Sequence, residues 1–443
     1  MRQTMIPGRA LAFVVLALVG EAAEALDWAG RLETSLLVDA ETAFQTVGGD
    51  LQKSQLTLTP QARLDISPST RITGIARLRF DGADELEPGR PSQATRAALS
   101  RRVFVKERAE LELRELYLDA FVGDVFLRLG KQQTVWGQAD GLKVLDVVNP
   151  QSYREFILAD YDDSRIPLWT AKAELPVGDG LLQLLWIPDR TYHDVPDPGA
   201  SYAFTTPRLV PESEPGTPVR LEAPDRPGRF FADSDAGVRY SVFAGGWDLT
   251  LNYLYHYDDT AVFGRRVTAD GVVVTPEYGR THTFGGTAST AFGSFTLRSE
   301  LAYSSNRRFI TKDPGDRDGI AASGELGYVL GLDWQAPGDT FVSGQVFQSR
   351  LTGTSRDLNR DAVDTSVTLL FEREFLHETV TASVLWIHGF HDGDGLVQPG
   401  IRYDVSSNLS VRFGADVFYG PEHGLYGEFD DTDRVTIGFE WGL

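Results

Sequence analysis

Arginine recurs on one face of alternating segments in the first third of the chain. In Leu51–Ile66 and Thr70–Phe80, polar or basic residues occupy every second position, and apolar residues fill most of the positions between them. Successive side chains of a strand point to opposite faces, so this spacing gathers the basic residues on one face. Six arginines of early, neighbouring segments are expected to line a lumen as one basic wall: Arg63, Arg71, Arg77, Arg79, Arg114 and Arg128. Basic residues along a pore favour anions, whereas pairing with inward carboxylates would only hydrate the interior.

The histidines and cysteines offer little further chemistry. The chain has 7 histidines, and they show no His-x-Ser arrangement on a strand of the kind that a barrel hydrolase would need. Cysteine is absent, which excludes disulfides and thiol catalysis. We therefore expect no enzyme, no metal site and no cofactor.

Period-two alternation continues along the whole mature chain and predicts an all-β fold, a transmembrane antiparallel β-barrel. The alternating segments number about eighteen, with sixteen as the alternative count. Their connections alternate between short turns such as Gly245-Gly246 and long loops such as Asp81–Arg108, as periplasmic turns and external loops do in bacterial barrels. A change of phase near Glu115 indicates a β-bulge.

Both ends of the chain indicate export to an outer membrane. Arg2 and Arg9 flank the start of the apolar run Ala10–Val19, and Ala23-Glu24-Ala25 follows as a cleavage pattern, so residues 1–25 are expected to be a signal peptide. Residues 26–443 then form one barrel domain. The last strand, Thr436–Leu443, resembles the C-terminal signal of outer-membrane proteins, which implies recognition by the barrel-assembly machinery and a location in the outer membrane of a Gram-negative bacterium.

The composition agrees with a membrane barrel, because strands with one apolar and one polar face have a low mean hydropathy. Hydrophobic residues make up 42% of the chain, and the mean hydropathy is −0.20. Much of the acidity behind the net charge of −21 falls in loops, as at Asp430, Asp431 and Asp433, where it either binds divalent cations shared with lipopolysaccharide or is merely solvated. Expected partners are outer-membrane lipid and lipopolysaccharide, with no nucleic acid; a homo-oligomer and an inner-membrane transport partner stay open. All eight tryptophans fall near expected strand ends, as in aromatic belts.

The most distinctive segment runs from Gly130-Lys131-Gln132 through Trp136-Gly137 to Asn149-Pro150. It resembles the Gly-Arg-Gln, Trp-Gly, Asn-Pro pattern of a poorly characterised family of porin-like Gram-negative outer-membrane barrels, with Lys131 in place of the usual arginine. By analogy with general porins, the third external loop, residues 137–167, is expected to fold inward as a constriction. Alternatively, it packs over the barrel mouth. A helical turn is expected at Leu142–Val148, ended by Asn149-Pro150. The charged residues expected at the constriction are Arg154, Glu155, Asp160, Asp162, Asp163 and Arg165.

These features predict an outer-membrane channel for small hydrophilic solutes, anions included. The alternative is a transporter for hydrophobic or partner-delivered molecules, in which Phe156, Ile157 and Leu158 of the same loop would guide the cargo toward a lateral exit.

Overall fold

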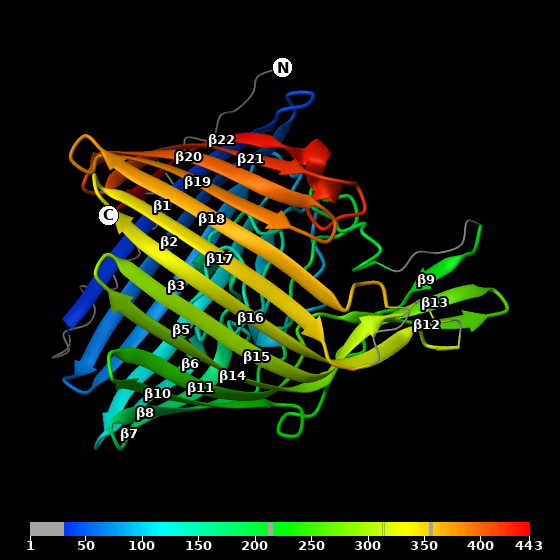
Figure 1. The fold of residues 1–443 in the computed structure, drawn as a ribbon, viewed down its shortest axis with the longest axis horizontal. Helices are drawn as coiled ribbons and strands as arrows, with labels where there is room; N and C mark the ends of the chain where they lie inside the picture. The colour runs from blue at the N-terminus through cyan, green and yellow to red at the C-terminus, as the bar shows by residue number, and fades with distance from the viewer. Residues whose placement is uncertain (1–30, 211–215, 312, 314, 354–357) are drawn as a thin grey trace.

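Eighteen strands form a closed antiparallel barrel in the part of the chain that the computed structural model describes, residues 31–210, 216–311, 313, 315–353 and 358–443 (Figure 1). Each barrel strand pairs with the next along the chain, and the last returns to pair with the first. The strands are β1 (Arg31–Gln45), β2 (Leu51–Ser67), β3 (Thr70–Asp81), β5 (Ala109–Val122), β6 (Val125–Gln132), β7 (Leu168–Val177), β8 (Gly180–Ile187), β10 (Asp235–Ala244), β11 (Trp247–Tyr257), β14 (Arg280–Phe292), β15 (Phe295–Ile310), β16 (Ile320–Ala336), β17 (Thr340–Leu351), β18 (Val363–Phe375), β19 (Val380–Gly389), β20 (Asp394–Ser406), β21 (Leu409–Tyr419) and β22 (Arg434–Gly442). The expected signal peptide, residues 1–25, lies outside the described residues.

Alternating hydrophobicity located all eighteen strands. The strands β2 and β3 are each one residue longer than the alternating segments Leu51–Ile66 and Thr70–Phe80 that predict them. The bulge expected near Glu115 is confirmed, because the register between β3 and β5 shifts between Ile75 and Ala76, opposite that residue. The predicted fold class is therefore confirmed.

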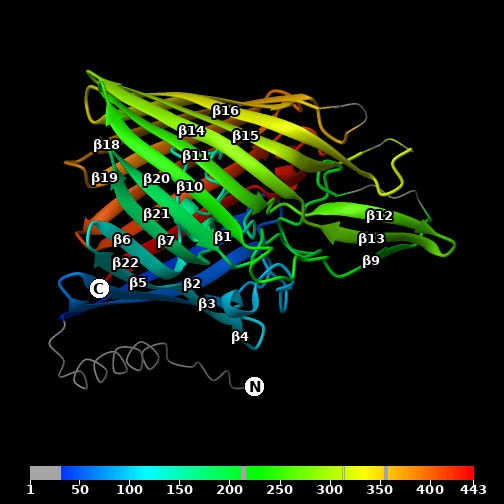
Figure 2. The same cartoon turned by 90° about the horizontal axis from the view of Figure 1, so that it is seen from below.

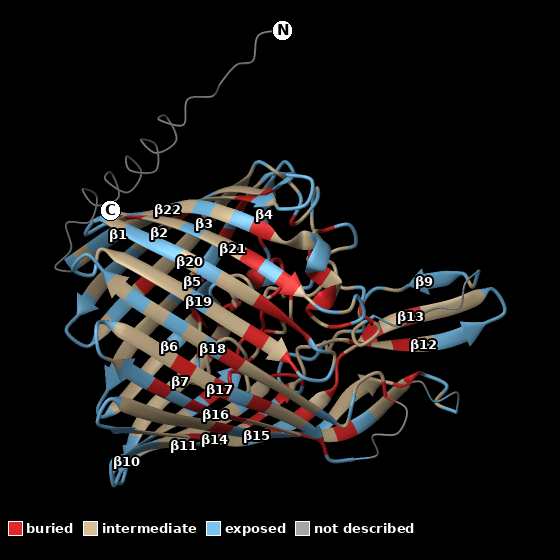
Figure 3. Cartoon of the chain, turned by 45° about the horizontal axis from the view of Figure 1, so that its top comes forward, coloured by how far each residue is buried: buried red, intermediate tan, exposed pale blue. Residues whose placement is uncertain are grey.

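The two faces of each strand differ as a bilayer requires. On β11, Leu251 is 71% exposed on the outer face, whereas the neighbouring Thr250 is 3% exposed and faces inward. Figure 3 shows buried residues concentrated in the half of the barrel that carries the long loops. The opposite end has tight turns, for example Gly245-Gly246, whose φ values of +60° and +85° suit a two-residue hairpin and favour glycine. We call these the long-loop end and the short-turn end.

Small elements that the alternation did not indicate decorate the long-loop end. β9 (Val219–Leu221), β12 (Val262–Thr268) and β13 (Gly271–Glu277) form a separate three-stranded sheet that projects away from the barrel in Figures 1 and 2. β4 (Val103–Val105) adds to the end of β5. Three short helices are also described: η1 (Ala98–Ser100), α2 (Tyr161–Ser164) and η2 (Gly427–Thr432). Among the described residues, no helix is long and apolar enough to cross a membrane.

Two local expectations were wrong. Trp136 does not belong to an aromatic belt, because it is 1% exposed and packs inside the barrel against Leu168 and Leu254. The helical turn expected at Leu142–Val148 is absent from this described segment, and the helix of the loop is α2, further along. Trp247, Trp334 and Trp441 are partly exposed near the short-turn end, as expected, and Trp28 lies outside the described residues.

Candidate functional site

The distinctive sequence segment forms the root of the loop that enters the barrel. Gly130 has a φ of +137°, and a Cβ there would lie 2.1 Å from the carbonyl oxygen of Leu116, so only glycine fits. The Lys131 ammonium donates to the carbonyl of Leu113 at 2.7 Å. The indole of Trp136 donates to Gln183 at 2.8 Å. These contacts turn the chain from β6 into the lumen.

Asn149 closes the same root from the other side. Its Oδ1 accepts a hydrogen bond from the backbone N–H of Thr134 at 2.7 Å, and its Nδ2 donates to the carbonyl of Ile166 at 2.9 Å. The amide therefore clamps the outgoing and returning strands of the loop together. Residues of the segment that suggested a family thus share one structural task, which is to hold residues 137–167 in the barrel.

The loop is then fastened to the barrel wall across the lumen. One Glu300 oxygen on β15 accepts from the backbone N–H groups of Gln138 and Ala139, the latter at 2.8 Å, and its other oxygen accepts from Leu145 N–H at 3.0 Å. Arg298, two residues earlier, donates to the carbonyl of Gln138 and to Asp140, both at 2.6 Å. One carboxylate and one guanidinium therefore fix the direction of the loop.

Further along, the loop contacts strands on both sides of the junction where the first strand, β1, pairs with the last, β22. A Cβ built on Gly141 lies 3.7 Å from the Thr368 Cβ on β18. Glu155 forms ion pairs with Lys53 on β2 and with Arg434 on β22, each at 2.9 Å. The loop therefore crosses the interior of the barrel and contacts strands on different sides of it.

Apolar packing completes the hold on the loop. Phe156 is 4% exposed and packs against Phe418 of β21 and Phe429 of η2. Ile157 and Leu158 pack against the same cluster. The residues considered as a guide for hydrophobic cargo are therefore part of a packed core.

The six arginines expected to form a basic wall occupy two different environments. Arg77, Arg79 and Arg114, in the long-loop half, are paired or hydrogen-bonded: Arg77 lies 2.7 Å from Glu112, Arg79 lies 3.2 Å from Glu110, and Arg114 donates to the carbonyl of Asp162 at 2.7 Å. Near the short-turn end, Arg71 pairs with Asp65, Arg128 pairs with Asp119, and Arg63 is exposed. Their role as pore-lining residues stays a prediction.

The residues expected at the constriction lie beside these arginines. Their basic members are buried, and most of their acidic members are exposed. Arg165 is buried and lies 2.8 Å from Asp146. Arg154 is buried as well, 3.0 Å from Asp81 and 2.6 Å from Glu87. In contrast, Asp160, Asp162 and Asp163 are exposed at and around α2, and the side chains of the last two are 91% and 69% exposed. The loop thus presents an acidic surface, which we call the acidic face (Asp160, Asp162, Asp163), over buried arginines.

Ion pairs join the other long loops to this assembly. Arg102, from the connection between β3 and β5, lies 2.9 Å from both Glu87 and Glu110. Arg96 lies 3.0 Å from Asp194, which belongs to the connection between β8 and β10. Although burial opposes ionisation, the charges of Arg102 and Arg154 hold the pKa of Glu87 well below its usual range. The network was not foreseen, because its members come from three loops whose mutual approach no local pattern indicates.

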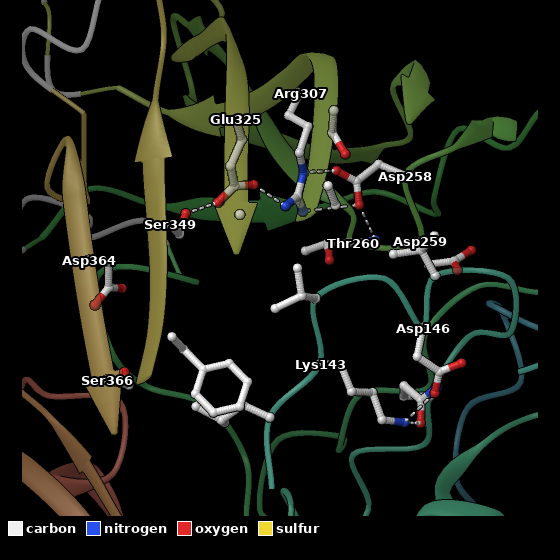
Figure 4. Close-up of a pocket in the computed structure, with 18 of the residues that line it drawn as sticks. Lys143, Asp146, Asp258, Asp259, Thr260, Arg307, Glu325, Ser349, Asp364 and Ser366 are labelled. Atoms are coloured by element: carbon white, nitrogen blue, oxygen red, sulfur yellow. Dashed lines mark hydrogen bonds and ion pairs between the residues drawn. The ribbon is translucent and has the colours of Figure 1, made fainter. Parts of the chain in front are cut away.

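A cavity of about 420 Å³ remains between the inward loop and the wall of β11 and β14–β18 (Figure 4). On one side Asp258 and Glu325 flank Arg307, with the first pair at 2.6 Å. Lys143 and Asp146 of the loop lie on the other side, 3.5 Å apart. Hydroxyl groups of Thr260, Ser349 and Ser366 also line it. The cavity is therefore polar and has a volume suited to a small solute.

Carboxylates outnumber cations around this cavity. Its lining includes seven acidic residues (Asp146, Asp258, Asp259, Glu325, Asp364, Asp392 and Asp394) and three basic ones (Lys143, Arg208 and Arg307). Arg208 is paired with Asp364 at 2.5 Å, whereas Asp259 has no cationic partner in the described part of the chain. Burial, with the nearby charges of Asp235 and Asp258, raises the pKa of Asp259 well above its usual value. Burial also lowers the pKa of Lys143 to about 8.

Comparison with known sequences identifies the family. Residues 104–358, more than half of the chain, match the family described as protein of unknown function DUF1302. The chain belongs to this family. The matched region includes the root of the inward loop and both of its anchors on β15, which agrees with the resemblance noted from the Gly-Lys-Gln, Trp-Gly and Asn-Pro residues. No curated protein matches the chain.

Solved structures share the barrel of this DUF1302 member at low identity. It is similar to OccAB2 of Acinetobacter baumannii, with 10% identity, a TM-score of 0.54 and coverage of 93% of this chain and 98% of the other. It is also similar to OccK9 (OpdG) of Pseudomonas aeruginosa, with 12% identity, a TM-score of 0.52 and coverage of 94% and 98%. OpdK of the same organism, crystallised with vanillate, has 13% identity, a TM-score of 0.51 and coverage of 93% and 98%. The fold is that of an outer-membrane porin.

Several residues of the site were not foreseen as such. Glu300 and Arg298 lie two residues apart on one face of β15, but nothing in their spacing indicated that they anchor a loop from another part of the chain. The cavity residues Asp258, Arg307 and Glu325 come from three separate segments. No group of three or more side chains suited to a metal ion occurs among the described residues.

Proposed function

We propose that this protein is a channel of the outer membrane through which small hydrophilic solutes diffuse past the inward loop, with cations and uncharged polar solutes preferred over anions. The observation that carries the proposal is the acidic face: the loop exposes Asp162 and Asp163 and buries the arginines beneath them. Asp162 pairs with Arg165 at 2.8 Å and Asp163 lies 3.5 Å from Arg77, but the carboxylates are exposed and the guanidinium groups are buried. An ion that passes the loop therefore meets the carboxylate oxygens first.

The cavity beyond the loop supports the same preference. Its carboxylates exceed its cations even when Asp259, whose pKa is raised, is left out of the count, and its hydroxyl groups offer hydrogen bonds to polar solutes. The anion preference expected from the inward arginines is therefore not favoured by the geometry. The alternation of strands indicated which face the arginines occupy, but not that carboxylates and the loop would cover them.

Transport of hydrophobic cargo finds less support. Phe156 is almost fully buried against β21 and η2, so it offers no free apolar surface for a cargo to follow. We accordingly keep a single proposed function.

The test is the reversal potential of the folded protein in a planar bilayer under a salt gradient. A charge about 10 Å from the path is worth about 0.4 kcal/mol in water, which 0.1 M salt reduces about three-fold. Since two charges act with opposite sign on cations and anions, the double variant D162N/D163N should lower the cation-to-anion permeability ratio about three-fold.

A matched control removes the same charge elsewhere. Asp430 and Asp431 are exposed on η2 at the long-loop end, away from the acidic face, so D430N/D431N should change the ratio much less. A folded barrel that conducts no ions would contradict the channel. A conducting barrel that prefers anions, or one in which both double variants act alike, would contradict the assigned role of the acidic face.

A further inference from the structure

A second pocket lies among the long loops and differs from the cavity in its charge. It has a volume of about 260 Å³ and is lined by Arg96, Arg101, Arg190 and Arg226, together with Ala97, Ala98, Pro227 and Gly228. We call it the arginine pocket. No acidic side chain belongs to its described lining, although the chain as a whole is strongly acidic.

Three of the four arginines lack a carboxylate partner among the described residues. Arg96 is satisfied by Glu112 and Asp194. Arg190 donates only to the carbonyl of Pro227, and Arg226 donates to the carbonyls of Ala94, Arg96 and Arg190. Arg101 is exposed and has no hydrogen bond or ion pair with the part of the chain that the structure describes.

The surroundings of Arg226 favour the binding of an anion. Its Nε is buried and has no hydrogen-bond partner among the residues that the structure describes, although its other nitrogen atoms are hydrogen-bonded. Burial, together with the like charges of Arg190 and Arg101, lowers the pKa of Arg226. Like charges that converge without a counter-charge are costly, and an anion in the pocket would relieve the repulsion.

Apolar side chains next to the pocket narrow the choice of anion. Leu99 follows the pocket residue Ala98 and is 74% exposed. Its carbonyl accepts a hydrogen bond from the indole of Trp169, which lies at the long-loop end of β7. Phe230 and Phe231 follow Gly228 closely and pack on Trp186, on the neighbouring strand β8. Trp169 and Trp186 share the outer face, because Trp186 pairs with Ala171, two residues from Trp169.

These five residues, Leu99, Trp169, Trp186, Phe230 and Phe231, form an apolar collar at the outer membrane interface, beside the arginine pocket. Aromatic side chains at this level mark the boundary between acyl chains and head groups. A small free anion would gain nothing from apolar side chains beside the pocket. A lipid would place its acyl chains on the collar and its head group in the pocket.

We propose that the arginine pocket binds the phosphate group of an anionic lipid of the outer leaflet, with the acyl chains against the apolar collar. Arginine suits this ligand because its planar guanidinium donates two parallel hydrogen bonds to phosphate oxygens. The proposal is independent of which solute passes the channel, since the pocket is separate from the cavity and from the acidic face.

The test measures retention of lipid A, which carries phosphate groups, by the folded full-length mature barrel in neutral detergent, using native mass spectrometry. The double variant R101Q/R190Q removes two arginines that have no carboxylate partner among the described residues. It leaves intact the hydrogen bonds that Arg226 donates to backbone carbonyls. We expect its affinity for lipid A to fall at least about ten-fold, because each charge-assisted hydrogen bond is worth about a factor of ten. The control R90Q changes an exposed arginine of the same loop that does not line the pocket, and it is matched in charge to the single variant R101Q.

The other probes separate the sources of phosphate. Phosphatidylcholine should bind weakly, and inorganic phosphate should not displace lipid A at comparable concentration. Binding of inorganic phosphate as tight as that of lipid A would overturn the lipid assignment in favour of a free anion. Equal retention of lipid A by the wild type and R101Q/R190Q would overturn the pocket itself.

Heat-modifiable migration on gels checks that each variant is folded, and the single variant R101Q serves if the double variant is not. Conductance of R101Q/R190Q should match the wild type. A failure of lipid binding is thereby distinguished from a failure of the channel proposal.

Discussion

Glu300 is the side chain whose removal should change the pore most directly. Its carboxylate accepts three backbone N–H groups of the inward loop, from Gln138, Ala139 and Leu145. A hydrogen bond to a charged group contributes about 1.5–3 kcal/mol. Because neighbouring bonds are not additive, E300A should weaken the attachment of this part of the loop by about 4 kcal/mol. That free energy shifts the balance between attached and released loop about a thousand-fold.

The expected result is larger and noisier single-channel conductance in planar bilayers, since residues 138–145 would leave the wall of β15. The lack of cysteine allows a matched control. Cysteines at Gly141 and Thr368 would have Cβ atoms about 3.7 Å apart, within the range of a disulfide. The φ of +79° at Gly141 costs about 1 kcal/mol in G141C, which the cross-link should exceed.

Oxidised G141C/T368C should hold the loop against β18 and return E300A to wild-type conductance, and reduction should restore the noisy state. Equal conductance of E300A and the wild type would refute the anchoring role of Glu300. Raised conductance that persists in the oxidised triple variant would show instead that E300A damages the barrel rather than freeing the loop.

Two further predictions concern the loop root and the cavity. Gly130→Ala should lower the free energy of unfolding in urea by about 3 kcal/mol or more, because its Cβ would lie 2.1 Å from the carbonyl oxygen of Leu116. Gly74→Ala on β3, where the nearest atom is 3.8 Å away, should be nearly neutral. Similar losses in both variants would contradict the close approach at Gly130. Burial lowers the pKa of Lys143 to about 8, so raising the pH from 7 to 9 removes a positive charge from the cavity and should increase the cation-to-anion permeability ratio. In K143M this increase should disappear, and a rise of equal size in both proteins would assign the titration to another group.

The barrel was largely predictable because its strands obey a local rule. Lipid on one side and a polar lumen on the other impose a period of two on each strand, and the short-turn end adds compact turn signals such as Gly245-Gly246. The loop root was also visible, since Gly130, Trp136 and Asn149 lie close together in sequence. The small sheet of β9, β12 and β13 was missed, because short strands inside long loops lack enough length for alternation to stand out.

The charge of the passage was less predictable, for a physical reason. Alternation assigns a side chain to the inner face, but its effect on a passing ion depends on what lies over it. Arg77 belongs to the inner face, as expected, yet it is 7% exposed and paired with Glu112, while Asp163 of the loop lies above it with a side chain 69% exposed. The carboxylate that lies over Arg77 therefore comes from a residue 86 positions away in the sequence. A strand pattern carries no information about such a contact, so alternation alone could not predict which charges the loop exposes.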